Sequence, residues 1–226
     1  LKKICGGGLG GLVEKEDIPP QAKLFSEQTI VINGKAHKIK VKIPRATVSR
    51  ELLSDFQYCK IAQSSNIRLI TGVKVKEICG STVITDKDTF EYKWLVGADG
   101  AASVVRKHLN LETRYNMGIY YDIPVESDSF LMYLDFPLMS TAYIWEFPFE
   151  NNLNTGIYYE KNLFDTKKAK SIIREYIQKR YSYSPENIKG FPIPYYFAGA
   201  EFGNIFLAGD AAGLCFRDNG EGISTA

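Results

Sequence analysis

Two stretches of the sequence place an aspartate among glycines directly after an apolar run. Residues 204–226 read NIFLAGDAAGLCFRDNGEGISTA and contain Asp210, and residues 92–100 read YKWLVGADG and contain Asp99. A buried strand that ends in this way delivers one carboxylate to a backbone that a bulky ligand can approach closely. A helix cap with packing glycines has the same pattern, but the presence of two such junctions in one chain favours ligand binding.

Two predicted helix starts add groups that can hold a polar or anionic ligand. The glycine cluster that ends at Gly222 precedes Ile223, where we expect a helix to begin with free amide N–H groups. Arg50 follows the capping residue Ser49 at the start of another predicted helix. A cation gains nothing from the helix dipole at that end, so Arg50 is either a surface side chain or part of an anion site.

A glycine-rich run with one thiol lies near the start of the chain. Residues 5–11 read CGGGLGG and contain a literal GxGxxG, but a dinucleotide-binding loop needs a buried strand before it and a long helix after it. Four residues precede Cys5, and Pro19 and Pro20 follow soon afterwards. We therefore interpret the run either as a loop that lays Cys5 over a flat ligand or as a plain flexible loop.

Three aromatic side chains recur at every second position of one predicted strand. Tyr143, Trp145 and Phe147 must point to the same face because side chains alternate along a strand. Such a face packs against a core or lines a large apolar pocket. The pattern alone leaves both interpretations open.

The rest of the pattern indicates the elements that carry these residues. Alternating apolar residues around Asn33-Gly34 predict a β-hairpin over residues 28–43, ended by Pro44. An amphipathic helix is expected after Ser49. Further expected elements are strands over 66–78 and 81–96, a helix over 101–109, aromatic-rich strands over 120–160, a helix from 165 or 166, and an extended connector over 190–194.

Composition narrows the class of protein. The 226 residues carry a formal net charge of +2, too balanced for a nucleic-acid binder. Four cysteines without CxxC spacing and only two histidines argue against a zinc site and for free thiols in a reducing cytosol. No apolar run reaches transmembrane length and no signal peptide is visible, so a cytoplasmic location is expected. The abrupt ends at Leu1 and Ala226 predict a fragment of a longer protein.

The motifs together resemble a known family. Gly97-Ala98-Asp99-Gly100 with Ser103 and Arg106 resembles the DG motif of flavoprotein monooxygenase-type folds, and the segment from Gly209 to Ile223 resembles their GD motif. The run Cys5-Gly6-Gly7-Gly8 and the YxWxFP pattern from Tyr143 to Pro148 are similar to motifs of the geranylgeranyl reductase family. That family saturates isoprenoid double bonds in chlorophyll precursors or archaeal lipids.

This resemblance implies a fold, a cofactor and an activity. The expected fold is α/β, an FAD-binding Rossmann-like domain of the p-hydroxybenzoate hydroxylase type with an inserted, mostly antiparallel β-sheet substrate domain. The expected division is a partial FAD-binding domain over 1–110 and 190–226, with the substrate domain over 111–189. The expected activity is reduction of geranylgeranyl-type double bonds by hydride transfer from reduced FAD, with NAD(P)H or ferredoxin left open as the electron donor.

The resemblance also implies roles for single residues. Asp210 would hold a ribityl-side hydroxyl of FAD, Asp99 would support its pyrophosphate region, and Val75 would touch adenine through its backbone. Cys5, near the reacting alkene, would be the proton donor. The full set of implied cofactor contacts is Cys5, Gly6, Arg50, Val75, Asp99, Asp210, Gly222 and Ile223, and the implied prenyl-pocket residues are Tyr143, Trp145 and Phe147.

Departures from the family pattern leave alternatives open. The N-terminal strand-GxGxxG-helix unit and the C-terminal part of the prenyl pocket are absent, and Arg217 and Asn219, with Cys215 nearby, replace the usual residues of the GD segment. An NAD(P)H-dependent flavin monooxygenase or halogenase, and an electron-transfer flavoprotein or a fragment without FAD, are the rival functions. The expected partner is a prenyl-chain small molecule or lipid and no nucleic acid. A basic helix face after residue 165 is either solvated or in contact with an anionic membrane surface.

Overall fold

The structure, a computed structural model, describes residues 5–10, 13 and 15–225, and these form two compact units. The first, here the sheet unit, comprises Leu1–Cys59 and Asn116–Pro192, and the second, the junction unit, comprises Lys60–Tyr115 and Ile193–Ala226. Apart from small shifts at residues 111–115 and 190–192, this division differs from the expected one in the first 59 residues. They belong with the large sheet because their hairpin pairs with its strands.

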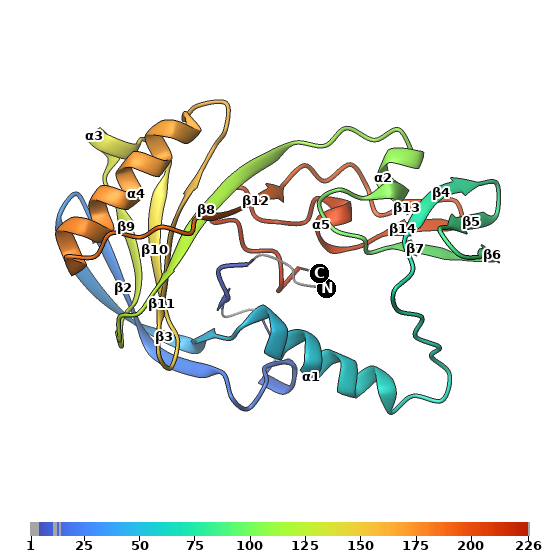
Figure 1. Cartoon of the computed structure of the whole chain (residues 1–226), viewed down its shortest axis with the longest axis horizontal. Helices are drawn as coiled ribbons and strands as arrows, with labels where there is room; N and C mark the ends of the chain where they lie inside the picture. Colours follow the sequence, from blue (N-terminus) through green and yellow to red (C-terminus); the bar gives the residue numbers. More distant parts are fainter. Residues whose placement is uncertain (1–4, 11–12, 14, 226) are drawn as a thin grey trace. The chain divides into compact units, whose positions relative to one another are not determined.

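One curled sheet of eight strands forms the sheet unit, in the order β1-β3-β2-β9-β10-β11-β8-β12 (Figure 1). Among the strand pairs whose register is known, β2 and β9 are parallel and the others are antiparallel. The strands are β1 (Gly8–Leu9), β2 (Lys23–Ile32), β3 (Lys35–Thr47), β8 (Tyr115–Ile123), β9 (Phe130–Leu134), β10 (Tyr143–Pro148), β11 (Leu153–Tyr159) and β12 (Lys189–Pro194). The helical elements of the unit are η1 (Lys15–Asp17), α1 (Arg50–Ala62), α3 (Phe136–Met139) and α4 (Thr166–Tyr181).

The predicted hairpin is confirmed and is longer than expected. Asn33 and Gly34 both adopt positive φ, at 46° and 82°, which the tight turn between β2 and β3 requires. The prediction that Pro44 ends the second strand is wrong, because β3 continues to Thr47. Pro44 lies where the register shifts between Arg45 and Lys40, so its missing N–H interrupts no regular ladder there.

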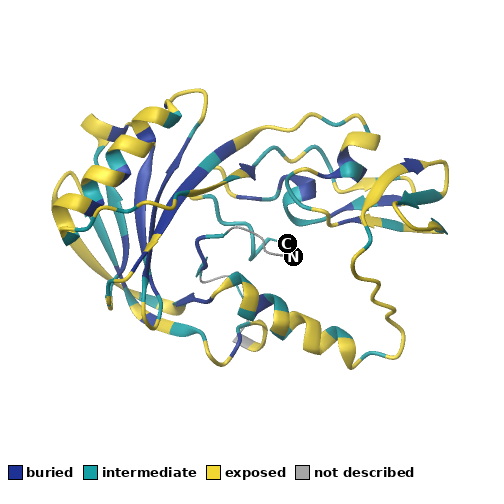
Figure 2. Ribbon diagram, in the orientation of Figure 1, coloured by how far each residue is buried: buried dark blue, intermediate teal, exposed yellow. Residues whose placement is uncertain are grey.

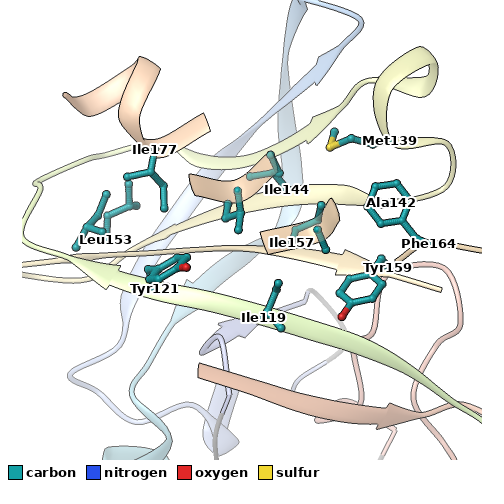
Figure 3. Close-up of a cluster of buried hydrophobic side chains, with 13 residues drawn as sticks. Ile119, Tyr121, Met139, Ala142, Ile144, Leu153, Ile157, Tyr159, Phe164 and Ile177 are labelled. Carbon is teal, nitrogen blue, oxygen red and sulfur yellow. The ribbon is translucent and has the colours of Figure 1, made fainter. Parts of the chain in front are cut away.

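Alternation along β8, β10 and β11 separates two faces of the sheet. The apolar core lies on one face and packs against α4, through Ile144, Ile157 and Ile177 among others (Figure 3). Tyr143, Trp145 and Phe147 lie on the opposite face, since they alternate with Ile144 along β10. Figure 2 shows that β10 and β11 are buried, whereas the far end of the β2–β3 hairpin is exposed.

A fully buried carboxylate fastens α4 to the sheet. Glu146 accepts hydrogen bonds of 2.7 Å from the hydroxyls of both Tyr176 and Tyr181, and an ion pair of 2.9 Å joins it to Arg180. Burial and the neighbouring carboxylate raise the pKa of both tyrosines far above the ordinary value, so both hydroxyls remain donors. The carboxylate oxygens are therefore compensated inside the sheet–helix interface.

The junction unit contains two small sheets and two short helices. In the sheet β13-β14-β7, the strands β14 and β7 run parallel, and each leads into a short helix, α5 after β14 and α2 after β7. The other sheet has the order β4-β5-β6. The strands are β4 (Val75–Cys79), β5 (Thr82–Thr85), β6 (Thr89–Glu91), β7 (Leu95–Gly97), β13 (Glu201–Phe202) and β14 (Ile205–Leu207), and the helices are α2 (Val104–His108) and α5 (Gly209–Ala212).

Several predicted bounds in the junction unit are wrong. The strand expected over 66–78 is present only as β4, and the one expected over 81–96 is divided into β5, β6 and β7. The helix expected at Ile223 is a turn, in which the Thr225 hydroxyl donates to the carbonyl oxygens of Leu214 and Gly222. Among the described residues, no helix is both long and apolar enough to span a membrane.

Removal of the Glu146 carboxylate tests its role in the sheet unit. We expect Glu146→Ala to lower the free energy of unfolding by about 2–4 kcal/mol, because two buried hydroxyls and a guanidinium lose their acceptor. Glu175→Ala is the matched control, because this α4 carboxylate is exposed and pairs with the exposed Lys179; its effect should stay below about 0.5 kcal/mol. Urea unfolding measures both, and equal effects would contradict the assignment.

Candidate functional site

The first aspartate junction is used as a helix cap. One oxygen of Asp99 accepts from the Ser103 hydroxyl at 2.5 Å, and the other accepts from the backbone N–H of Val104 at 2.6 Å and of Val105 at 3.4 Å. The carboxylate therefore satisfies the first amides of α2. A contribution of Asp99 to the FAD pyrophosphate region stays a prediction.

Arg106 connects the two junctions. Its side chain is buried and donates to the carbonyl oxygens of Ala211 at 2.9 Å and Tyr196 at 2.8 Å, as well as to Glu112. Ala211 belongs to α5, the helix that carries Asp210, so the guanidinium ties α2 to α5. The sequence singled out Arg106 as part of a motif but indicated no role for it.

The second junction brings Asp210, Cys215 and Gly222 together. The Cys215 thiol donates to Oδ1 of Asp210 at 3.4 Å. A Cβ added to Gly222 would lie 2.5 Å from Cys215 Sγ and 3.5 Å from Asp210 Oδ1. The chain therefore returns to the carboxylate after α5, as the prediction of a shared site for Asp210 and Gly222 requires. Gly213 permits this return, because its φ is 74° and a Cβ there would lie 2.2 Å from the Tyr196 carbonyl oxygen.

The residues that depart from the family pattern shape the returning segment. The backbone N–H of Phe216 donates to the Glu221 carbonyl oxygen at 2.8 Å, and the Asn219 side chain accepts from the Glu221 N–H at 2.9 Å. Arg217 lies over the ring of Tyr195, 5.4 Å from its centroid. Asn219 and Arg217 thus stabilise the local turn and its packing.

In the sheet unit, the predicted thiol lies in a loop that rests on aromatic rings. We call residues 5–9 the glycine loop. A Cβ on Gly6 would lie 3.3 Å from Trp145 Nε1, and one on Gly8 would lie 2.5 Å from the Phe147 ring. A Cβ on Gly7, whose φ is 78°, would come about as close to the Phe149 ring. The glycines are therefore required for contact with the rings, and Gly8 pairs with β3 instead of preceding a helix; Gly11 of the GxGxxG lies outside the described residues.

The aromatic residues predicted from β10 are part of a larger surface. We define the aromatic face as Tyr120, Tyr143, Trp145, Phe147 and Tyr158, all on the side of the sheet opposite α4. The ring centroids of Trp145 lie 5.9 Å from Phe147 and 6.4 Å from both Tyr120 and Tyr143. The prediction that Tyr143, Trp145 and Phe147 share a face is confirmed, and this face is not the one that packs against α4.

Polar side chains on the same face form hydrogen bonds with one another. The Trp145 indole donates to Asn154 at 2.7 Å, and Asn154 donates to Asp122 at 2.8 Å. Lys189 donates to the other oxygen of Asp122 at 2.7 Å. Sequence reasoning missed these partners because they come from three strands; alternation along β8 and β11 could have placed Asp122 and Asn154 on a face but could not have paired them.

The remaining predicted contacts lie at element ends. Arg50 is the first residue of α1. Ser49, directly before it, caps the helix as predicted, because its hydroxyl oxygen accepts a hydrogen bond from the Leu52 N–H at 3.1 Å. Val75 begins β4 and pairs with Thr85, and Ile223 is half-buried in the turn after Gly222. Cys5, Gly6 and Arg50 belong to the sheet unit, whereas Val75, Asp99, Asp210, Gly222 and Ile223 belong to the junction unit.

Unpartnered polar atoms test whether these segments fit the FAD that the resemblance implies. Among the described residues, three buried side-chain atoms have no hydrogen-bond partner: Nε of Arg50, Oε1 of Glu221 and Oγ of Ser224. Buried polar atoms are rarely left unpaired without a bound group. In the junction unit, two of these atoms flank Gly222 and Ile223, where the Glu221 oxygen can accept from a ligand hydroxyl or N–H and the Ser224 hydroxyl can donate or accept. In the sheet unit, the Arg50 Nε can donate to a ligand oxygen. Each segment by itself has groups that suit the hydroxyl, ring and phosphate groups of FAD.

The fit of Trp145 against Gly156 is open to test. A Cβ at position 156 would lie 2.4 Å from the indole carbon Cζ2 and 2.5 Å from the Ile119 carbonyl oxygen. We expect Gly156→Ala to displace the indole and to cost about 1–3 kcal/mol of unfolding free energy, measured by urea unfolding together with tryptophan fluorescence. Gly190→Ala, where the nearest atom is the Ile119 side chain at 3.0 Å, should cost less. The reverse order would contradict this packing.

Known proteins share the fold and part of the sequence. An uncharacterized protein of Methanosarcina barkeri is 30% identical over 245 aligned positions, which cover 98% of this chain and 61% of that protein. A geranylgeranyl bacteriochlorophyll reductase-like protein from Thermoplasma acidophilum matches with a TM-score of 0.78 and 16% identity, over 98% of this chain and 64% of that one. The probable FAD-dependent monooxygenase pqsL from Pseudomonas aeruginosa matches with a TM-score of 0.68 and 16% identity, over 91% and 65%.

These likenesses confirm the expected fold class, and the chain spans less than two thirds of the length of each of these relatives. The family model described as FAD binding domain matches residues 72–226, which include both aspartate junctions and the returning segment. FAD is the cofactor of that family, as the DG and GD motifs had indicated. The chain belongs to the family of FAD binding domains.

Proposed function

We propose that this oxidoreductase reduces isoprenoid double bonds of the geranylgeranyl type. The observation that carries the proposal is the contact of the glycine loop with the aromatic face, where Gly6 and Gly8 lie against Trp145 and Phe147. This contact holds Cys5, a protic side chain, beside a surface that suits a hydrocarbon chain. The structural likeness to a geranylgeranyl bacteriochlorophyll reductase-like protein agrees with this substrate class.

The chemistry of the aromatic face favours an apolar substrate over a polar one. The strongest donors and acceptors there are paired with each other, Trp145 with Asn154, Asn154 with Asp122, and Asn116 with the Tyr158 hydroxyl at 2.7 Å. A polar substrate would have to break such pairs, and a buried group left unpaired costs about 1–3 kcal/mol. A prenyl chain needs only contact with the rings.

The proposed reaction needs two electrons and two protons for each double bond. The chemistry that reduced FAD would supply when bound is a hydride for one alkene carbon. Cys5 supplies the proton that forms the C–H bond at the other carbon, and its thiolate then regains a proton from solvent. The aromatic face orients the chain and excludes water from the reacting carbons.

The cofactor roles are part of the same proposal. Asp210 would hold FAD by accepting a hydrogen bond from one of its ribityl-side hydroxyls, and the amides of Gly222 and Ile223 would contribute to holding its ring. Arg50 contributes its guanidinium, and Asp99 supports the pyrophosphate region through the α2 cap. The unpartnered Nε of Arg50 and the contact of Gly222 with the Asp210–Cys215 pair support these assignments.

A second candidate is an NAD(P)H-dependent flavin monooxygenase on the same fold. The similarity to the probable FAD-dependent monooxygenase pqsL favours it. A monooxygenase consumes oxygen and transfers one oxygen atom to an aromatic substrate, whereas the reductase consumes no oxygen and adds two hydrogen atoms. Product mass and oxygen uptake therefore distinguish the two.

A lipid substrate would bring the protein to a membrane surface. The outer side of α4 carries exposed cations, with Lys167 and Lys170 among them. We propose that this face contacts anionic headgroups, because clustered lysine and arginine side chains are attracted to such a surface.

Replacement of the thiol tests the proposed reaction. FAD is reduced with dithionite under anaerobic conditions, and a geranylgeranyl lipid should gain 2 Da per reduced double bond by mass spectrometry. We expect Cys5→Ala to lower kcat by about 100-fold or more, since it removes the general acid. Cys59→Ser, an exposed thiol of α1, is the control and should retain activity. No mass gain with the unaltered protein, together with oxygen uptake on an aromatic substrate, would overturn the proposal.

FAD affinity tests the cofactor roles without any substrate. Asp210→Ala should weaken FAD binding by about 10–100-fold, because a hydrogen bond to a charged group contributes about 1.5–3 kcal/mol. Val75→Ala is the control: its proposed contact is through the backbone, and the side chain is 37% exposed, so the affinity should stay within about two-fold. Quenching of flavin fluorescence measures both. Equal affinities of the two variants would contradict the role of Asp210.

A further inference from the structure

Cys215 is fixed from both sides in the segment that returns after α5. The residue before it donates its backbone N–H to the Gly209 carbonyl oxygen at 3.2 Å, and the residue after it donates to the Glu221 carbonyl oxygen at 2.8 Å. The first bond ties the segment to the helix that carries Asp210, and the second ties it to the turn before Gly222. Cys215 is 8% exposed, so its thiol is enclosed where the chain is held at both places.

The thiol contacts the carboxylate and the glycine together. It donates to Oδ1 of Asp210 at 3.4 Å. A Cβ added to Gly222 would lie 2.5 Å from the sulfur and 3.5 Å from that carboxylate oxygen. The sulfur is therefore the first group that a side chain at position 222 would meet. Within the junction unit, the thiol joins the two residues that the proposed cofactor site needs side by side.

A thiol suits the task of orienting a carboxylate that must also bind a ligand. At the first junction, the Ser103 hydroxyl and the first amides of α2 engage both oxygens of Asp99. At the second junction, the Cys215 thiol reaches Asp210 from outside α5. An ionised carboxylate offers about four acceptor sites, and a thiol is a weak donor that occupies one of them. A carboxylate held in this way can still accept from a ligand hydroxyl.

We propose that Cys215 is the positioning residue for Asp210: its thiol holds the carboxylate beside the Gly222 backbone and so sets the direction in which it can accept from FAD. This inference rests on the proposed role of Asp210 in holding FAD. Its structural content is independent of that role, because the hydrogen bond joins two groups of the junction unit and needs neither cofactor nor substrate.

The first measurement tests the contact without cofactor. The other three cysteines are replaced by serine, so that Cys215 is the single thiol of the sequence, and its S–H stretching band is recorded by infrared spectroscopy. A hydrogen bond lowers the frequency of that band, so Asp210→Ala should raise it. Asp218→Ala removes an exposed carboxylate of the same segment and should leave the band unchanged. An unchanged band in Asp210→Ala, or equal shifts in both variants, overturns the proposal.

The second measurement is the affinity for FAD, followed by quenching of flavin fluorescence. Cys215→Ala should weaken binding about five-fold, which corresponds to one hydrogen bond of about 1 kcal/mol. Cys215→Ser should bind within about two-fold of the unaltered protein, because a hydroxyl is also a donor to the carboxylate. A serine variant as weak as the alanine variant contradicts the positioning role.

Ile78→Val is the matched control for packing. Like Cys215→Ala, it removes one heavy atom from a buried side chain of the junction unit. Its affinity for FAD should stay within about two-fold of that of the unaltered protein, since a small loss of core packing lowers stability and leaves the carboxylate in place. Equal losses of affinity in Ile78→Val and Cys215→Ala overturn the proposal.

A double variant tests whether the thiol acts through Asp210. In a protein that already carries Asp210→Ala, Cys215→Ala should change the affinity by less than about two-fold. A further loss of about five-fold would mean that the thiol supports FAD binding separately, which overturns the positioning role.

The same affinities distinguish failure of this inference from failure of the proposed function. If Asp210→Ala weakens FAD binding and Cys215→Ala does not, the positioning role fails and the role of Asp210 stands. If Asp210→Ala leaves the affinity unchanged, the proposed role of Asp210 fails. If the unaltered protein reduces no prenyl lipid while the expected affinities hold, the proposed reaction fails and the positioning of Asp210 by Cys215 stands.

Discussion

The contact of the Trp145 indole with Gly156 is the constraint on which the aromatic face depends. The ring covers Gly156 of β11, where a side chain would obstruct it, and its N–H is fixed by Asn154. Because the indole lies close to the sheet, the glycine loop can approach it until Gly6 is in contact. A looser indole would leave the loop without a defined surface, since packed interiors tolerate few voids.

Polar networks on the two faces of the sheet stabilise different features. On the α4 face, Glu146 compensates two hydroxyls and a guanidinium and thereby fixes the helix to the sheet. On the other face, the polar groups of Asn154 and Asp122 fix an aromatic ring. Both networks include β10, in which Trp145 and Glu146 are adjacent in sequence and point to opposite sides. One strand, β10, therefore carries both the side chain that anchors α4 and the ring that the glycine loop contacts.

Features with a local cause were predictable from the sequence. The Asn33-Gly34 turn, the Ser49 cap and the shared side of Tyr143, Trp145 and Phe147 follow from backbone preferences or from alternation. The pairing of Asn154 with Asp122, 32 residues apart, depends on strand register, which no local pattern determines. The strand expected over 66–78 failed for a related reason: β-propensity reflects pairing with a neighbouring strand, and residues 66–74 belong to no strand of the described structure.

The two aspartate junctions show why a motif alone does not settle a role. They share the order strand, glycine, aspartate, helix, yet Asp99 gives both oxygens to the start of α2, whereas Asp210 receives the Cys215 thiol from a segment that returns after its helix. The difference arises after the motif, at Gly213, whose backbone conformation turns the chain so that Gly222 comes back to Asp210. Arg106 then joins the capped junction to the returning one through Ala211. Asp99 thus supports the start of α2 and Arg106 ties α2 to α5, whereas the Asp210 carboxylate lies beside Gly222 and its contact with a ligand stays a proposal.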